Sequence, residues 1–360
     1  MNIQETKSLL KKVFTNKLTI VPAVIGPKGI GKTELLKQCA KELNMGYQAV
    51  YPSSLQGEDF MGLLEKDKES NITYYLPPDF FPTDNAVKNK LFPEEGLFVI
   101  EEFNRADTQT ISALFPLLLE RKVNNHSLAK GWRMVVSMNP ESMEYMTNTI
   151  DNAGMDRIMP INVSPDLDEY ASYMLNNNLS NDSIMEFLYA HKEMFNQDEL
   201  KNDMGKSPSP RGWTKTCEVL NAFECTPAEQ HQILSGLVGS EASASYIGFL
   251  KDRDVEYPDV DKILKNYTKE QQRIVKKIID SNRYDIMNLT LKRMVIGIDE
   301  KDNKHVKNLD KFLGDLNSEL QTVFVQQLAK EKKDPMPLLN KMPDKKEQII
   351  QKLMEISTSE

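Results

Sequence analysis

Short apolar runs alternate with longer stretches of helical periodicity between about residues 18 and 163. The runs have the length of buried strands, and the stretches between them are long enough for helices. An alternation of this kind predicts an α/β fold in which helices cover a parallel sheet. The expected strands are Leu18–Ile25, Tyr47–Tyr51, Leu97–Glu101, Met134–Met138 and Ile158–Val163.

After this region the pattern is helical throughout. Ser164 and Pro165 are expected to cap and begin the first helix, since serine is a preferred N-cap and proline suits the first helical position. The expected helices lie near residues 166–177, 182–195, 210–223 and 227–238. The charged stretch Lys251–Val260 contains a Tyr-Pro step and is typical of a domain boundary. Further helices are expected beyond it, with a loop at 331–346 and a frayed end from residue 357.

Composition is typical of a soluble protein, with 40% hydrophobic and 27% charged residues among 360. No apolar run approaches the roughly 20 residues that cross a bilayer, and Met1–Phe14 is expected to be a surface helix and not a signal peptide. Cys39, Cys217 and Cys225 lack metal-ligand spacing, so we expect reduced core thiols and a cytoplasmic location. A net charge of -8 disfavours bulk electrostatic binding of nucleic acid.

A phosphate-binding loop is encoded between the first expected strand and a helix. Its residues, which match G-x-x-x-x-G-K-[ST], are Gly26, Pro27, Lys28, Gly29, Ile30, Gly31, Lys32 and Thr33. The glycines let backbone N–H groups converge on phosphate oxygens. Lys32 is expected to reach the β- and γ-phosphates, and the Thr33 hydroxyl to ligate Mg²⁺. A chance glycine turn is the weaker interpretation, so ATP and Mg²⁺ are the predicted cofactors.

Two adjacent acids, Glu101 and Glu102, end the apolar run that starts at Gly96. Neighbouring side chains on a strand point to opposite faces, so the two acids are expected to have different roles. One is expected in the Mg²⁺ shell, and the other is expected to orient the attacking water. The alternative is a strand that runs into an acidic surface turn.

The run GLFVIEEFNRADTQTISALFPLLLERKV, which holds these acids, is similar to the Walker B region of MoxR-type (dynein-related) AAA+ ATPases. SLQGEDFMG and YYLPPDFFP resemble the segments between the two Walker motifs of that family. The resemblance covers about residues 15–225. It implies a P-loop AAA+ parallel sheet core over 1–164 and a helical lid over 165–255. The helical pattern beyond the charged boundary predicts a helical C-terminal extension over 256–360.

The resemblance also implies roles for the two acids. Glu102 matches the family's catalytic glutamate, which implies that it is the general base or the residue that orients the attacking water. Glu101 stands where the family has aspartate as the Mg²⁺ ligand, and its side chain is one methylene longer. This departure implies either slower hydrolysis or a rebuilt metal site.

Asn139 and Arg211 match the two sensors of the family. Asn139 ends the strand-like run from residue 132 and corresponds to sensor 1, although an Asn-Pro turn is the simpler interpretation. Arg211 follows Ser209 and Pro210, which are expected to cap and begin a helix. A cation there opposes the helix dipole, and the resemblance supplies a reason for it, since Arg211 corresponds to sensor 2.

A trans-acting arginine is the remaining element of the motif set. Arg157 ends the segment DNAGMDR (151–157), which resembles the family's interface segment. It is expected to enter a neighbouring subunit's site and neutralise charge on the transferred phosphate. Two alternatives stay open: a local ion pair of Arg157 with Asp156 or with a carboxylate one turn away, and Arg105 as the finger.

Three functions follow from these observations. The resemblance implies an ATPase that assembles with copies of itself, six by the family's habit, and remodels or matures a partner protein, usually one with a von Willebrand factor A domain. Glu101 in place of aspartate favours a second function, a slow nucleotide-gated binding module. A nucleic-acid motor is the third, disfavoured by the acidic charge balance and by the lack of a recognisable nucleic-acid-binding domain. No membrane partner is expected.

Overall fold

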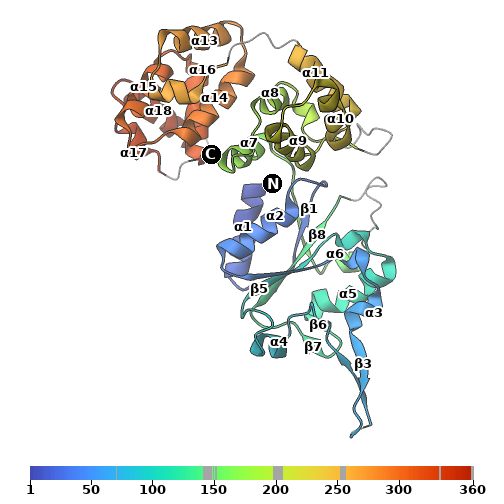
Figure 1. The fold of residues 1–360 in the computed structure, drawn as a ribbon. Helices are drawn as coiled ribbons and strands as arrows, with labels where there is room; N and C mark the ends of the chain where they lie inside the picture. Colours follow the sequence, from blue (N-terminus) through green and yellow to red (C-terminus); the bar gives the residue numbers. More distant parts are fainter. Residues whose placement is uncertain are drawn as a thin grey trace. The chain divides into compact units, whose positions relative to one another are not determined.

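The structure is a computed structural model, and it describes residues 1–69, 71–140, 148, 150, 152–197, 206–251, 257–331 and 334–357. The chain forms two compact units, Met1–Glu169 and Tyr170–Glu360. All the strands of the described residues belong to the first unit, and the second is helical (Figure 1). None of the helices in the described ranges is both long and apolar enough to span a bilayer.

The first unit contains a five-stranded parallel sheet with the order β2-β5-β8-β1-β9. Its strands are β1 (Pro22–Ile25), β2 (Gly46–Val50), β5 (Gly96–Ile100), β8 (Trp132–Met138) and β9 (Met159–Asn162). All residues of β5 and β8 are buried, as expected for central strands covered on both faces. The predicted α/β fold with a parallel sheet is confirmed, and so is each of its five strands.

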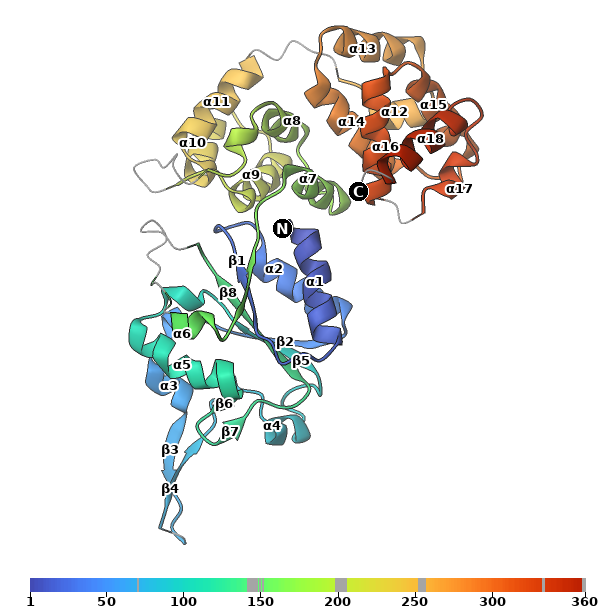
Figure 2. The same cartoon turned by 180° about the vertical axis from the view of Figure 1, so that it is seen from behind.

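Helices cover both faces of the sheet. The helices of this unit are α1 (Ile3–Thr15), α2 (Lys32–Glu42), α3 (Gly57–Met61), α4 (Asp84–Lys88), α5 (Thr108–Glu120) and α6 (Asn152–Met155). Val135 of β8 packs with α1 and α2, whereas its neighbours Met134 and Val136 pack with α5. Figures 1 and 2 show α1 and α2 on one face and α5 on the other. The predicted N-terminal surface helix is therefore confirmed.

The region between β2 and β8 contains elements that the sequence pattern did not predict. A two-stranded hairpin of β3 (Leu63–Lys66) and β4 (Thr73–Leu76) projects away from the sheet (Figures 1 and 2). Its side chains are mostly exposed, including Leu63 at 68% and Ile72 at 63%. The remaining short elements are the hairpin β6 (Lys122–Val123) and β7 (His126–Ser127) and the 3₁₀ turns η1 (Pro52–Ser54) and η2 (Phe103–Arg105).

The helix after β9 begins later than predicted. It is α7 (Leu167–Asn176), and the prediction that Ser164 caps it is wrong. The carboxylate of Asp166 accepts a hydrogen bond from the Glu169 N–H at 2.9 Å. A carboxylate satisfies the first free N–H groups of a helix well, so the helix starts after Asp166.

The second unit continues with helices only in its described residues. They are α8 (Asp182–Ala190), η4 (Lys192–Met194), α9 (Pro210–Ala222), α10 (Pro227–Val238), α11 (Ser240–Lys251), α12 (Val260–Lys265), α13 (Lys269–Asp280), α14 (Tyr284–Gly297), α15 (Asn303–Gly314), α16 (Ser318–Glu331), α17 (Met336–Leu339) and α18 (Lys346–Ser357). Helix α17 lies inside the segment 331–346 that was expected to be a loop, so that prediction is wrong in part. Its residues Leu338 and Leu339 are buried in the apolar core that α12–α18 share.

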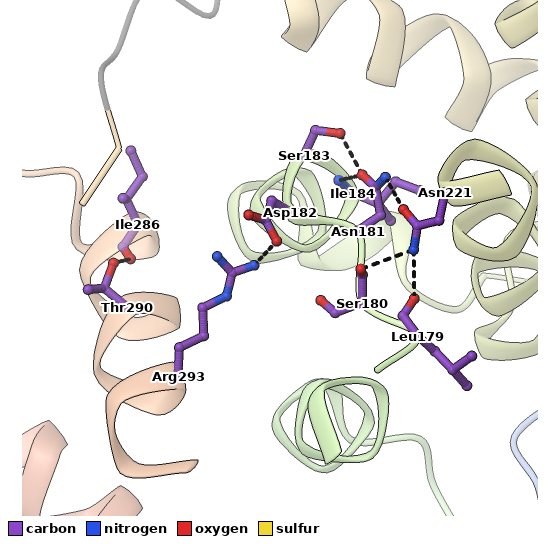
Figure 3. Close-up of polar contacts among 10 residues, drawn as sticks. All are labelled: Leu179, Ser180, Asn181, Asp182, Ser183, Ile184, Asn221, Ile286, Thr290 and Arg293. Carbon is purple, nitrogen blue, oxygen red and sulfur yellow. Dashed lines mark hydrogen bonds and ion pairs between the residues drawn. The ribbon is translucent and has the colours of Figure 1, made fainter. Parts of the chain in front are cut away.

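Parts of the predicted boundary, of the predicted loop and of the predicted frayed end lie outside the described residues, namely 252–256, 332–333 and 358–360 respectively. Helices on either side of that boundary nevertheless contact each other. Arg293 of α14 forms an ion pair with Asp182, the first residue of α8 (Figure 3). Asn181, the N-cap of α8, donates to Asn221 Oδ1 at 2.7 Å and so ties α8 to α9. The division of this unit into a lid and a C-terminal extension remains a prediction.

Two of the three cysteines are core thiols. Cys39 in α2 and Cys217 in α9 are buried and free, and burial raises the pKa of Cys39 to about 11 and that of Cys217 to about 12. Cys225 differs from the prediction, because it lies between α9 and α10 and is only half-buried.

Candidate functional site

The phosphate loop joins β1 to α2 and has a backbone that requires glycine. Gly31 has a φ of 103°, a left-handed conformation that other residues avoid. A Cβ on Gly26 would lie 2.6 Å from the Val163 carbonyl oxygen. Gly31, the N-cap of α2, has no side chain that could cap this helix start. A helix that begins at a glycine loop of this kind is the arrangement that phosphate sites use.

Lys32 is buried at the base of the loop, with 9% of its surface exposed. Its Nζ donates to the carbonyl oxygens of Gly26 at 2.5 Å and Pro27 at 2.9 Å, and to Asn139 Oδ1 at 3.0 Å. The structure thus brings together two predicted site residues that lie 107 positions apart. Neutral oxygens hold the ammonium group next to the loop, where it can meet a phosphate oxygen.

Sheet order explains why these residues meet. Ile25 of β1 is paired with Met138 of β8, and β8 is paired with β5 on its other side. The carboxyl ends of these three neighbouring parallel strands lead into the phosphate loop, Asn139 and Glu101. In open α/β sheets, ligands bind at the carboxyl ends of the strands. The candidate site is therefore at this edge.

The two acids differ in their surroundings. Glu101 is buried, at 2% exposure, and its Oε1 accepts a hydrogen bond from the Tyr47 hydroxyl at 3.3 Å. Burial, together with the charge of Glu101, raises the pKa of Tyr47 above its usual value, so the hydroxyl stays protonated and donates. Glu102 is half-exposed, and its Oε2 accepts from Arg105 Nη1 at 2.7 Å.

The reason for this divergence is not the one that the sequence pattern suggested. β5 ends at Ile100, so Glu101 and Glu102 lie in a turn beyond the strand, which we call the acidic turn. Glu102 has a left-handed backbone with a φ of 53°. A non-glycine residue in this region is uncommon and is found at functional sites. The backbone of Glu102, and not strand alternation, separates the two side chains.

The donor set fits Mg²⁺ in part. The Thr33 hydroxyl and the Glu101 carboxylate are the hard oxygen ligands that Mg²⁺ prefers. Among the described residues, no group of three or more His, Cys, Asp or Glu side chains could hold a metal by itself. A Mg²⁺ at this site would therefore complete its shell with phosphate oxygens and water, as is usual for this ion.

The three predicted arginines lie in different places. The Arg157 guanidinium stacks on the Phe115 ring of α5, 5.2 Å from its centroid. Arg105 is exposed and bonded to Glu102 of its own chain. Arg211 is exposed in the first turn of α9, which Ser209 caps as predicted. Asp151, at the start of the Arg157 segment, lies outside the described residues. The roles of all three arginines remain predictions.

Two residues at this edge were missed by the sequence reasoning. Tyr47 bonds Glu101, and Asn104 bonds the backbone of Asn139 through its side chain. Asn104 could have been noticed as an amide within the acidic turn motif. Tyr47 carries no local signal, because its role depends on the pairing of β2 with β5.

One family model matches the part of the chain that contains most of this site. Residues 23–158 match the family model of the AAA domain (dynein-related subfamily), a range that holds the site residues from Gly26 to Arg157. No curated protein matches the chain.

Solved structures resemble the chain only distantly. The Thermotoga maritima RuvB Holliday junction branch migration motor is 13% identical with a TM-score of 0.35, covering 78% of this chain and 76% of that one. PCH-2 of C. elegans is 16% identical with a TM-score of 0.33, covering 70% and 68%. Similarities of this size carry no functional argument.

Proposed function

We propose, from the premise that residues 23–158 are an AAA domain of the dynein-related subfamily, that this chain binds ATP with Mg²⁺ and hydrolyses it in a ring of its own copies. The turnover would remodel or mature a partner protein, as in MoxR-type ATPases. The observation that carries the proposal is the contact between Lys32 and Asn139 at the edge where the phosphate loop and the acidic turn meet.

Each residue has a distinct part in the proposed reaction. The N–H groups of the loop and the Lys32 ammonium bind the phosphates. Thr33 and Glu101 would hold Mg²⁺, which would neutralise the charge that develops on the phosphates. Glu102 orients the attacking water, and Asn139 holds that water or the γ-phosphate. The 2.7 Å contact with Arg105 involves Oε2 of Glu102 and does not by itself exclude this role for the carboxylate.

The exposed hairpin supports the idea of a protein partner. Leu63, Leu64 and Ile72 are more than half exposed on a ribbon of only two strands. Large apolar side chains gathered on a surface often mark a contact with another protein. The family resemblance suggests that the partner carries a von Willebrand factor A domain. We propose this partner class on the resemblance alone.

A measurement of phosphate release tests the proposed ATPase. The purified chain is expected to release phosphate from ATP with Mg²⁺, and EDTA should lower the rate by at least about 100-fold, because a bound metal contributes several kcal/mol to the transition state. Replacing EDTA by a Mg²⁺-saturated chelator is the control. Tight ATP binding without measurable turnover would contradict the ATPase.

That outcome would favour the second candidate, a nucleotide-gated binding module. The observation behind it is Glu101, whose carboxylate extends one methylene further than that of the aspartate it replaces. The third candidate, a nucleic-acid motor, remains disfavoured by the net charge of -8. An increase in the rate of ATP turnover on addition of DNA or RNA would favour the nucleic-acid motor.

Shortening the metal-side acid distinguishes the first two candidates. If Glu101 is an imperfect Mg²⁺ ligand, Glu101→Asp should give equal or faster turnover, because the carboxylate regains the length that the family uses. The matched control is Tyr47→Phe, which removes the hydroxyl contact to Glu101 but keeps the acid. A fall in kcat for Glu101→Asp with Tyr47→Phe unchanged would mean that the site is built around the longer acid.

A further inference from the structure

A buried asparagine connects the acidic turn to the end of β8. Asn104 lies in η2, two residues after Glu102, and only 1% of its surface is exposed. Its Nδ2 donates to the Asn139 carbonyl oxygen at 2.8 Å, and its Oδ1 accepts from the Asn139 N–H at 3.2 Å. One side chain therefore holds both main-chain polar groups of Asn139.

These contacts continue to the phosphate loop. The side chain of Asn139 accepts a hydrogen bond from Lys32 Nζ at 3.0 Å. On the other side, the Asn104 carbonyl accepts from the Asn148 N–H at 2.7 Å, and Asn148 Nδ2 donates to Ala106 at 2.6 Å. The acidic turn is thus held from both sides, and Asn104 is the side chain that links it to Asn139 and, through Asn139, to Lys32.

The chemistry of this position requires an amide. Binding a carbonyl and an N–H of the same residue takes one donor and one acceptor on a short planar group, which asparagine provides. Aspartate of the same shape can only accept when ionised, and its charge would face the Asn139 carbonyl. Alanine would leave two buried main-chain groups without their partner. Both substitutions would release the backbone that aims the Asn139 side chain.

We propose that Asn104 is a positioning residue for ATP hydrolysis, which fixes Asn139 in register with Lys32 and with the Glu102 turn. The inference rests on the proposed function. Asn104 acts through Asn139 on the chemical step, and its side chain takes no part in binding ATP. Its loss should lower kcat, while ATP affinity stays close to that of the wild type.

Turnover and binding of a non-hydrolysable ATP analogue should be measured for Asn104→Ala, Asn139→Ala and the double variant. We expect Asn104→Ala to lower kcat about 10- to 100-fold, since a misplacement of about 1 Å can cost about 100-fold. Affinity for the analogue should change less than about threefold, within the limits of independent sites. In the Asn139→Ala background, Asn104→Ala should cause no further loss of kcat. Asn148→Ala, which removes the side-chain bond to the Ala106 carbonyl on the other side of the turn but keeps the main-chain bond to Asn104, is the matched control and should keep most of the activity.

Other outcomes overturn the inference. Multiplicative losses of kcat in the double variant would show that Asn104 does not act through Asn139. Parallel losses of thermal stability, analogue affinity and kcat would show a merely structural role. If Asn104→Ala fails to fold, the isosteric Asn104→Asp replaces it in the single and double variants. The expected changes in kcat and analogue affinity are the same. If the wild type shows no ATP turnover, the proposed function is wrong. If the wild type turns over ATP and the kcat losses of the two single variants multiply in the double variant, only the role of Asn104 is wrong.

Discussion

Replacing Lys32 by alanine is expected to weaken ATP binding by at least about 100-fold, because two charge-assisted hydrogen bonds of about 1.5–3 kcal/mol each are lost. The ammonium group is buried at the base of the loop, and Gly26, Pro27 and Asn139 hold it with neutral oxygens. A phosphate would be its anionic partner at this site. No other group of the loop carries a buried positive charge to replace it, since the only other lysine of the loop, Lys28, is exposed.

Calorimetric titration with a non-hydrolysable ATP analogue and Mg²⁺ measures this loss. Lys28→Ala is the matched control, because it removes a lysine from the same loop at an exposed position. It should change the affinity by less than about fivefold, the scale of an exposed ion pair. If folded Lys32→Ala protein binds the ATP analogue as tightly as the wild type does, the phosphate loop does not have the role in ATP binding that we propose.

The second large effect concerns Glu102 and Arg157 in a mixed assembly. Glu102→Gln should keep ATP binding but slow turnover by at least about 100-fold, because the amide keeps the shape and loses the base. Arg157→Ala should slow turnover by about 10³- to 10⁵-fold if the arginine acts on the phosphate of a neighbouring subunit. Each variant alone should therefore be nearly inactive.

Mixing the two variants should restore part of the activity. In a mixed ring, some sites combine an intact Glu102 with an intact Arg157 from the neighbour. A head-to-tail interface of this kind closes into a ring when its rotation allows. Phosphate release by the mixture, compared with each variant alone at equal total concentration, gives the measurement. Light scattering with the ATP analogue and Mg²⁺ reports whether the variants assemble.

Arg105 provides the internal comparison. It is already bonded to Glu102 of its own chain at 2.7 Å, whereas the Arg157 guanidinium rests on the Phe115 ring. We therefore expect Arg105→Ala alone to keep most of its turnover, so that mixing it with Glu102→Gln restores nothing that was lost. An Arg105→Ala protein that is nearly inactive alone and regains activity in this mixture would make Arg105 the finger. No restoration in either pair, despite assembly, would mean that Arg157 acts within its own subunit or not at all. If the wild type stays monomeric in the presence of the ATP analogue and Mg²⁺, the proposed ring is wrong.

Local pattern was sufficient for the sheet and the phosphate loop. The strands were predictable because buried parallel strands are continuous apolar runs, and β5 and β8 are such runs. The loop was predictable because its glycines and Lys32 occupy fixed spacings within eight residues. The cap of α9 by Ser209 was predictable for the same reason, since a cap depends on residues within one turn.

The local sequence pattern gave wrong predictions where two nearby residues could each cap a helix, and where residues distant in the sequence bury a segment. Ser164 and Asp166 are both acceptable caps, and only the 2.9 Å bond from Glu169 shows which one begins α7. Helix α17 forms in a segment rich in proline and lysine because Leu338 and Leu339 join the core of α12–α18. The hairpin of β3 and β4 was missed because its apolar side chains face outward.

The internal geometry of the site was decided by tertiary structure alone. Lys32 and Asn139 are 107 residues apart, and Asn104 and Asn139 are 35 apart. They meet because β5, β8 and β1 are neighbours in the sheet, an order that differs from their order in the chain. Glu102 faces Arg105 because its backbone adopts a left-handed conformation. The sequence therefore predicted which residues form the candidate site, while non-local strand pairing and one strained turn determined how the described residues contact one another.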